Sequence, residues 1–519
     1  MKRILTIGAI FALALGFASC NKNKSNIPDT PTQEGTTYMS LTFRLPAESG
    51  TRAEDKTNND IGQWEGRDKF ENVDVYLVTD GAKSVEKKSL KVVSKATSTA
   101  DGVYKTESWK TTPGEKTVYV VVNNGGDIKA ALDAATVTNF AKVYNEAYEM
   151  LKSGKVKADY ASASKTEDII MMTGQPVKQK INDGISQDKA NAAADTAGED
   201  VDNNKVQVTV RRVVSRVSVS ANNGLISDGV AQIETTDGTV IGTLKDLSWT
   251  PMQLEQTSYL LWQNVKEDGV DYTALATKSP SYSYVPVNSS YGTEAPNKYS
   301  YDRKDEALTI RPDFVRNAEN GKNVSWITGD GNNMEFITEN THKDYRRGNT
   351  TYVKVTGTFV PDAGTWAEGE KAKYEEELAT NPTPSIYWGA TTGKFYFDKT
   401  TATKMNPVSE EAAKAKKDGI IEFKAGKMYY FAWINPDKTD HLKWTTSPVV
   451  RNNIYHINIS AFKNVGLYRN PYDPEDPTDP DPDDPDPKDP DDPLNDKETY
   501  MVTEVTVINW GMHSYDVEF

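Results

Sequence analysis

The chain has 519 residues, 37% of them hydrophobic and 10% aromatic, so it can bury the cores of two or three domains. Its net charge of −15 argues against nucleic acid as a partner. The single cysteine, Cys20, excludes an intramolecular disulfide, and the four dispersed histidines show no metal-ligand spacing, which argues against a metal site.

The first 20 residues read as a targeting signal. Lys2 and Arg3 precede an apolar run, residues 4–17, that is too short to span a membrane as a stable helix. Small residues directly before Cys20 resemble a bacterial lipobox, in which the cysteine is lipidated and becomes the new N-terminus. The alternative is an ordinary signal peptide with an incidental cysteine. A lipid chain tethers a protein without spanning the membrane, so we expect a lipoprotein precursor at the cell envelope.

Residues 21–52 contain a predicted strand and a possible cleavage site. Within 38–46 apolar residues alternate with polar ones, which is the pattern of a strand with one buried face. The apolar positions are Met39, Leu41, Phe43 and Leu45. A polar loop with an arginine, Arg52, follows, and such loops are where proteases cut. Taken alone, this stretch favours an ordinary linker.

Residues 53–222 are predicted to form an N-terminal β-sandwich domain. Strand patterns cover residues 73–78, 116–124 and 206–220, and helical spacing covers residues 128–152. In 206–220 the valines change parity at Arg211 and Arg212, which predicts a bulge or a break there.

Residues 223–470 are predicted to form a second β-sandwich domain. Strand patterns cover residues 350–360, 393–398, 427–435 and 452–462. In the last of these His456 alternates with apolar residues and is predicted to lie on the surface. The fold class is therefore all-β dominated: two β-sandwich domains with a few short helices.

The sequence contains no motif for catalysis or for a cofactor. GxSxG, HExxH, P-loop and dinucleotide-binding patterns are absent, and the glycine-containing stretch 328–333 has no strand-and-helix context. We therefore expect no enzyme activity, no catalytic residue, no cofactor and no metal.

An Asp/Pro-rich linker, residues 471–493, precedes the last segment, residues 494–519. The linker holds eleven acidic residues, one lysine and nine prolines, so it should be extended and self-repelling, with a reach of about 70 Å. It lacks the glycine turn and terminal glutamate of an EF-hand calcium loop.

Several segments together resemble the Mfa-type major fimbrillins, the shaft subunits of short fimbriae in the type V pilin family. They are GFASC before and at Cys20, TYMSLTFRLP followed by an arginine, the segments 344–357, 429–436 and 447–459, the Asp/Pro linker and the ending WGMHSY. The resemblance covers nearly the whole chain.

The resemblance implies a fold and a maturation route. The domains would be transthyretin-like sandwiches, Cys20 the lipidation site and Arg52–Ala53 the bond cut by an Arg-specific surface protease. Residues 494–519 would be a donor strand on an extended linker, and subunits would polymerise head to tail by strand exchange. The implied partners are further copies of the chain, accessory and anchor fimbrial subunits, and the outer membrane through the lipid before cleavage. The assembled fimbria at the cell surface would support adhesion and virulence.

A repeated tripeptide predicts the register of the donor strand. Thr37-Tyr38-Met39 recurs as Thr499-Tyr500-Met501. With the methionines aligned, Met501, Val505 and Val507 would replace Met39, Phe43 and Leu45, and a second strand would extend the contact. That second strand would run from Trp510 to Phe519 and include Tyr515 and Val517.

Two alternatives remain at the level of sequence. The chain could be a tip or accessory fimbrial subunit. It could also be a monomeric surface lipoprotein that binds glycans or another protein. Exposed aromatics such as Trp388, Trp433 and Trp444 could then stack on sugars, although packing in a core or an interface is their commoner fate.

Overall fold

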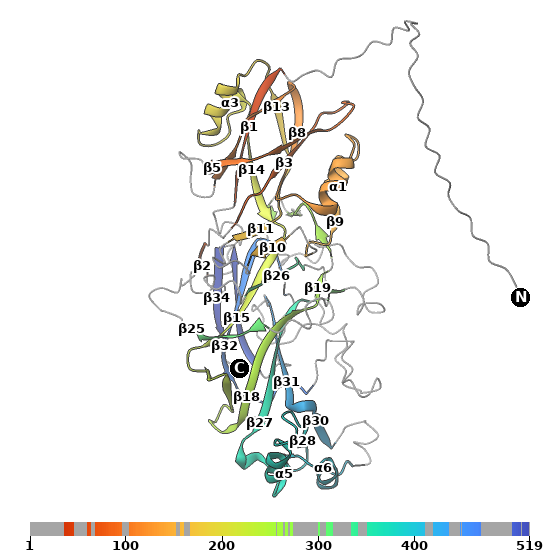
Figure 1. The fold of residues 1–519 in the computed structure, drawn as a ribbon, viewed down its shortest axis with the longest axis vertical. Coiled ribbons are helices and arrows are strands. Elements are labelled where there is room, and N and C mark those ends of the chain that lie inside the picture. The colour runs from red at the N-terminus through yellow and green to blue at the C-terminus, as the bar shows by residue number, and fades with distance from the viewer. Residues whose placement is uncertain are drawn as a thin grey trace, which may run out of the picture.

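The protein consists mostly of β-strands, arranged in two β-rich domains stacked end to end (Figure 1). The predicted fold class, all-β with a few short helices, is confirmed. The structure is a computed structural model, and it describes residues 36–45, 60–63, 68–95, 103–151, 156–159, 167–255, 257–262, 265–267, 270–272, 299–300, 308–314, 334–340, 350–409, 419–434, 447, 449–468, 501–509 and 511–517. No helix among these residues is long and apolar enough to cross a membrane.

The N-terminal domain is built on a sheet of ten strands within the described residues. Its order is β4-β3-β8-β12-β14-β1-β6-β5, with β13 beside β8 and β7 beside β1. The bounds are β1 Thr37–Arg44, β3 Val73–Val78, β4 Glu86–Leu90, β5 Val92–Lys95, β6 Val103–Thr106, β7 Trp109–Thr111, β8 Gly114–Val122, β12 Met172–Gly174, β13 Val177–Ile181 and β14 Lys205–Arg212. Strand β14 pairs with β1 over its first half and with β12 over its last three residues, so it joins the two layers around the core.

Short helices accompany this sheet. They are α1 Gly126–Ala134, α2 Phe140–Tyr144 and α3 Gln187–Ala194. The single helix expected over 128–152 is two shorter ones. The backbone leaves the helical region at Ala135, and the Asn139 side chain then accepts a hydrogen bond from the Thr136 N–H, so the second helix starts anew.

The C-terminal domain holds a sheet of thirteen strands within the described residues, ordered β2-β34-β32-β17-β18-β27-β31, with β15, β16, β24, β25, β26 and β33 attached to it. The bounds are β2 Asp60–Gln63, β15 Ser215–Asn222, β16 Ile226–Ser227, β17 Val230–Glu234, β18 Val240–Met252, β24 Leu308–Thr309, β25 Arg311–Phe314, β26 Met334–Ile337, β27 Tyr352–Pro361, β31 Lys427–Trp433, β32 Asn453–Phe462, β33 Met501–Asn509 and β34 Gly511–Val517.

The predicted break in 206–220 is present, because β14 ends at Arg212 and β15 begins at Ser215. The two strands belong to different sheets. The sheets therefore divide at residues 213–214, ahead of the boundary expected at residue 222.

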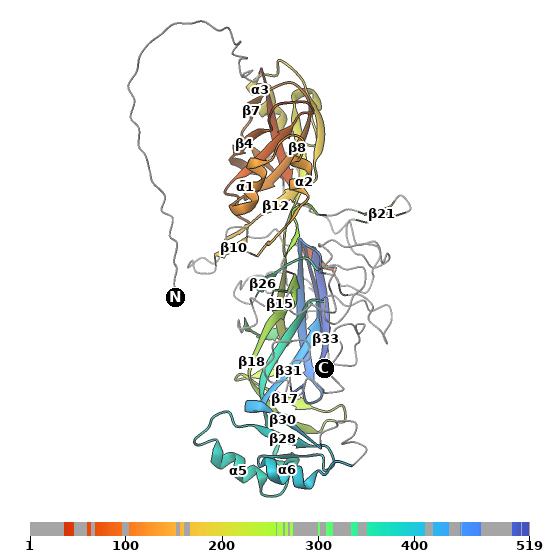
Figure 2. The same cartoon turned by 90° about the vertical axis from the view of Figure 1, so that its right-hand side faces the viewer.

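A small cap forms the end of the C-terminal domain farthest from the N-terminal domain (Figure 2). It contains a three-stranded sheet and two helices: β28 Ile386–Gly389, β29 Lys394–Tyr396, β30 Ile420–Phe423, α5 Glu370–Glu377 and α6 Lys399–Met405. Its core joins the main core of the domain through Phe395, whose ring centroid lies 5.2 Å from that of Phe359 on β27.

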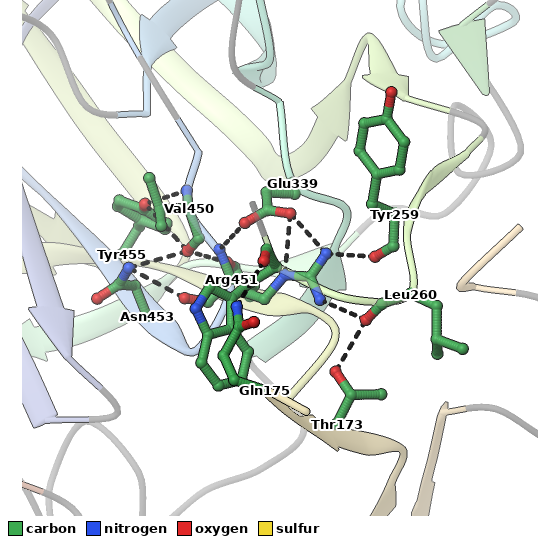
Figure 3. A network of polar contacts seen from close by, with 11 residues as sticks. Thr173, Gln175, Tyr259, Leu260, Glu339, Val450, Arg451, Asn453 and Tyr455 are labelled. Atoms are coloured by element: carbon green, nitrogen blue, oxygen red, sulfur yellow. Dashed lines mark hydrogen bonds and ion pairs between the residues drawn. The ribbon is translucent and has the colours of Figure 1, made fainter. Parts of the chain in front are cut away.

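Buried polar contacts join the two domains (Figure 3). The Arg451 guanidinium donates to both the Glu339 carboxylate, at 2.7 and 2.9 Å, and the Leu260 carbonyl oxygen, at 2.9 Å. The Thr173 hydroxyl, from β12, donates to the same Leu260 carbonyl at 2.8 Å. A single carbonyl therefore receives one hydrogen bond from each domain.

His456, expected on the surface, is buried, and so is Trp433, which the glycan-binding alternative needs to be exposed. His456 is 1% exposed, and its Nε2 lies 2.7 Å from the Ser220 hydroxyl, because β32 runs between β15 and β34 with both faces covered. Trp433 is also 1% exposed and stacks edge-on with Tyr352. Trp388 is half-buried against Phe395, and Trp444 lies outside the described residues. The buried position of Trp433 does not fit a sugar-stacking surface.

Candidate functional site

Strand β1 occupies an interior position in the N-terminal sheet. It pairs in parallel with β14, from Ser40–Lys205 to Arg44–Thr209, and antiparallel with β6 and β7 on its other side. Both rows of its backbone groups are therefore hydrogen-bonded to neighbours. Removing the strand would leave a slot with unpaired backbone groups on β14 at one side and on β6 and β7 at the other.

The apolar face of β1 forms part of the domain core. Its side chains and the residue after it are buried, with exposed fractions of 0% for three and 7% for the fourth: Met39, Leu41, Phe43 and Leu45. The Phe43 ring stacks on Tyr104 at 5.5 Å between centroids and meets Phe70 edge-on at 5.3 Å. At about 25 cal/mol per Å² of apolar surface, withdrawal of these side chains would cost several kcal/mol.

A polar anchor fixes the first residues of β1. The Thr37 hydroxyl accepts the Ile185 N–H at 3.0 Å and the Asn204 side-chain amide at 3.1 Å. The same amide donates to the carbonyls of Tyr38, at 3.0 Å, and Asn182, at 2.9 Å. Asn204 has a left-handed backbone, with φ 56°, which asparagine tolerates better than most residues.

The second face of β1 is also covered. Ser40 and Thr42 point away from the core yet are 0% exposed, because helix α3 packs against this side of the strand. Two lysines lie there on the neighbouring strands. Lys105 of β6 pairs with the Asp195 carboxylate at the end of α3, and Lys205 of β14 donates to the Thr196 carbonyl oxygen at 2.6 Å. Burial lowers the pKa of Lys205.

The C-terminal strands lie in the second domain of their own chain. Strand β34 pairs in parallel with β32, and Met501 at the start of β33 pairs with Phe462 at the end of β32. In the sequence, residues 463–500 separate these two paired residues. A hairpin connection needs only about two to five residues. The connection is therefore far longer than the contact requires.

The structure places only part of the expected site. Cys20, Arg52, Ala53, Trp510 and Phe519 lie outside the described residues, as does the linker. Met501, Val505 and Val507 lie in β33, and Tyr515 and Val517 lie in β34. Within one chain β33 pairs with β32, and β34 pairs with β32 and β2. Neither strand pairs with β14 or β6, which are neighbours of β1.

Sequence reasoning missed the polar side of the β1 site. Lys105, Lys205 and Asn204 carry no motif, and only the pairing of their strands brings them beside β1. No group of acidic residues, histidines or cysteines among the described residues is arranged to hold a metal ion.

Comparison with known proteins relates this chain to fimbrial proteins. Residues 421–516 match the family described as "Major fimbrial subunit protein type IV, Fimbrillin, C-terminal". Two sequences of the minor fimbrium subunit Mfa1 from Porphyromonas gingivalis are each 36% identical to this chain over 543 aligned positions, and the alignments cover 100% of both proteins.

Solved structures show a weaker similarity. A fimbrilin (FimA) from Porphyromonas gingivalis W83 is 13% identical with a TM-score of 0.41, covering 93% of this chain and 99% of that one. A putative cell adhesion protein from Parabacteroides distasonis is 12% identical with a TM-score of 0.43, covering 92% and 98%.

Proposed function

The chain belongs to the family of Mfa1-type fimbrial subunits, and from that membership we propose that it is a shaft subunit that polymerises by donor-strand exchange. The precursor would be exported as a lipoprotein through Cys20 and cut after Arg52 by an Arg-specific protease. The cut would release β1 from the N-terminal domain. The C-terminal strands of another subunit would then fill the vacated slot.

The observation that supports this proposal is the interior position of β1, whose residues from Met39 to Phe43 are all buried. An arginine follows this strand in the polar loop, so one cut can separate a core strand from the rest of its domain. A domain that loses such a strand exposes apolar surface and two rows of unpaired backbone groups. That surface favours addition of a strand from another molecule.

The length of chain between Phe462 and Met501 supports the second half of the proposal. These two residues are paired neighbours in the isolated subunit. A short turn would therefore be enough to connect them, and residues 463–500 are longer than this contact needs. A Pro-rich acidic linker spans about 3.1 Å per residue and can carry the terminal strands beyond the subunit. The contact would join unlike surfaces and would not close, so it would build a fibre.

Fimbrial membership places the subunit at the cell surface, and the remaining partners are part of the proposal. They are other copies of this chain, accessory and anchor fimbrial subunits, the protease, and the outer membrane before cleavage. Adhesion would be a property of the assembled fimbria.

The test is an Arg52→Ala variant in the native cell. We expect lipidated, full-length protein that does not polymerise, whereas the wild-type protein should form fibres whose subunits begin at Ala53. Electron microscopy of surface protein and N-terminal sequencing measure both properties. Arg44→Ala is the matched control, because Arg44 is exposed at the end of β1 and its loss should leave cleavage and assembly intact. Fibres of normal length from Arg52→Ala would refute the proposal.

A further inference from the structure

We propose that Lys105 and Lys205 form a carboxylate-binding site in the acceptor slot, and that Glu504 of the incoming donor strand occupies it in the fimbria. The inference rests on the proposed strand exchange and adds the residue that sets its register. It concerns the face of β1 that lies under α3, opposite the apolar core.

The two lysines converge on one end of α3. The Lys105 ammonium group pairs with the Asp195 carboxylate, and the Lys205 ammonium group donates to the carbonyl of the next residue, Thr196. Lys205 is 0% exposed and the Lys105 side chain is 19% exposed. Asp195 is the ion-pair partner of Lys105, and the charges of Asp200 and Asp195 partly counter the effect of burial on the pKa of Lys205. Among the described residues the buried Lys205 ammonium group has no carboxylate within ion-pair distance, so a further carboxylate could help to compensate its burial.

Strand β1 offers the two lysines no carboxylate. Ser40 is directly beside Lys205 on β14, and Thr42 is directly opposite Lys105 on β6, so all four side chains lie on the same face. The hydroxyls of Ser40 and Thr42 are buried and have no hydrogen-bond partner among the described residues. Within the described part of the chain, the strand that fills the slot before cleavage thus makes no side-chain hydrogen bond at Ser40 or Thr42.

The donor strand offers a carboxylate at the matching position. Alignment of Thr499-Tyr500-Met501 with Thr37-Tyr38-Met39 places Glu504 at the position of Thr42, directly opposite Lys105. A carboxylate there can accept charge-assisted hydrogen bonds, which are stronger than those of a hydroxyl. The donor would therefore bind this side of the slot more tightly than β1 does.

The polar anchor independently favours the same register. In that alignment Thr499 takes the place of Thr37, whose hydroxyl accepts hydrogen bonds from Ile185 and Asn204. Withdrawal of β1 leaves both donors without this partner, and a threonine at the same position restores it. A slip of one residue would instead turn Glu504 into the apolar core.

The positions of the chain ends agree with this strand direction. The described chain before the linker ends at Tyr468, whose ring lies 6.5 Å from Phe423 in the distal cap. The Thr37 end of the slot lies beside α3, at the opposite end of the molecule (Figure 1). When the cap of one subunit faces the α3 end of the next, a linker leaving the cap meets the slot at its Thr37 end, and the donor runs in the direction of β1.

The test compares two glutamates of the donor segment in the full-length precursor cut with an Arg-specific endoprotease. Glu504→Gln keeps the shape of the side chain and removes its charge, and it should slow fibre growth about tenfold or more. Glu498→Gln is the matched control. Glu498 aligns with the exposed Thr36, which donates to Asp183, so loss of its negative charge should leave growth unchanged or faster. Light scattering and the urea concentration that dissociates the fibres measure both variants.

An engineered cross-link checks the register without changing the lysines. Thr506 aligns with Arg44, which pairs with Thr209, so Thr506→Cys with Thr209→Cys should give disulfide-linked ladders. Thr506→Cys with Gln207→Cys, two residues out of register, should not. Absence of fibres from cleaved wild-type protein would overturn strand exchange itself. If fibres form but the two glutamine variants grow at equal rates, or if the second cysteine pair gives ladders, only the carboxylate site is overturned.

Discussion

At the scale of single residues, buried charges define the joint between the domains. Arg216 and Asp168 are both 0% exposed and lie 2.7 Å apart, and Arg451 and Glu339 are both 1% exposed at the same distance. The charge attraction in such pairs is largely offset by the loss of hydration, so their net stabilisation is small. An unpaired charge at these positions would be costly, however. The pairs therefore favour one arrangement of the domains over others.

A buried carboxyl in the C-terminal domain makes the stability of the protein depend on pH. Burial raises the pKa of Glu255 to about 8, from 4.5. Between these two pH values the folded state binds more protons than the unfolded state, so the free energy of unfolding falls as the pH rises and levels off above about pH 8. We expect Glu255→Gln to remove this component, which is of the order of a few kcal/mol.

Urea unfolding of wild type and Glu255→Gln at pH 5 and pH 9 measures the effect. Other carboxyl groups also titrate, so the relevant quantity is the difference between the two proteins. At pH 9 the free energy of unfolding of the variant should be higher than that of wild type. At pH 5 this gain should be small. A constant difference across this range would show that Glu255 is ionised in the folded state at both values.

Elements differ in how many of their faces are buried, and β1 is buried on both. From Met39 to Phe43 every residue is buried, whereas Arg44 is exposed. The alternating pattern predicts the face with Met39 and Leu41, because apolar residues mark a core. It cannot predict the cover over Ser40 and Thr42, because small polar residues suit both solvent and the close approach of a helix such as α3.

The proposed donor strand can be tested by placing a charge on each of its two faces in turn. Val505 and Val507 align with Phe43 and Leu45, so Val505→Asp with Val507→Asp should place unpaired charges in the core and abolish polymerisation. Thr506 aligns with exposed Arg44, so Thr506→Asp should have a mild effect. Fibre yield by electron microscopy measures assembly, and circular dichroism checks that the cleaved monomers stay folded. If the substitutions on the two faces of the strand reduced fibre yield equally, this register would be excluded.

Strand positions were predictable from the sequence to a greater extent than burial was. Residues 73–78 match β3 because valine and tyrosine, which favour strands, dominate this stretch between turn residues, although Asp74 interrupts it. His456 was wrongly predicted to be exposed, because alternation implies one solvated face and β32 has strands on both sides and covered faces. Lys205 gave no signal at all. Its burial depends on contacts between segments far apart in the chain.

On the scale of the whole molecule, the two domains form a rod with different ends. The slot with its polar anchor lies toward the α3 end, and the chain leaves for the linker beside the distal cap. Unlike ends favour head-to-tail addition, in which every new subunit presents the same free surface as the previous one. The two unlike ends of the molecule would thus fix the direction in which subunits are added.

The linker is predicted to act through reach and stiffness. A neutral Pro-rich sequence of equal length in place of residues 473–492 should retain assembly, because charge matters little beyond about 8 Å at physiological salt. Deletion of most of these residues should prevent assembly, because the donor could no longer reach the next subunit. Sedimentation of the cleaved variants compares the polymer fractions. Loss of polymer on neutralisation alone would indicate a bound cation or a basic partner instead.

Strand β2 would give the proposed cut after Arg52 a second effect. It pairs antiparallel with β34, from Asp60–His513 to Gln63–Gly511, at the edge of the C-terminal sheet. Its residues follow Arg52 closely, so a cut there gives β2 a free end and makes its fraying from β34 easier. One hydrolysed bond would then open an acceptor and loosen a donor in the same molecule. Acceptor slots and donor strands would then be released in a ratio of one to one. Neither would accumulate in excess of the other while the fibre grows.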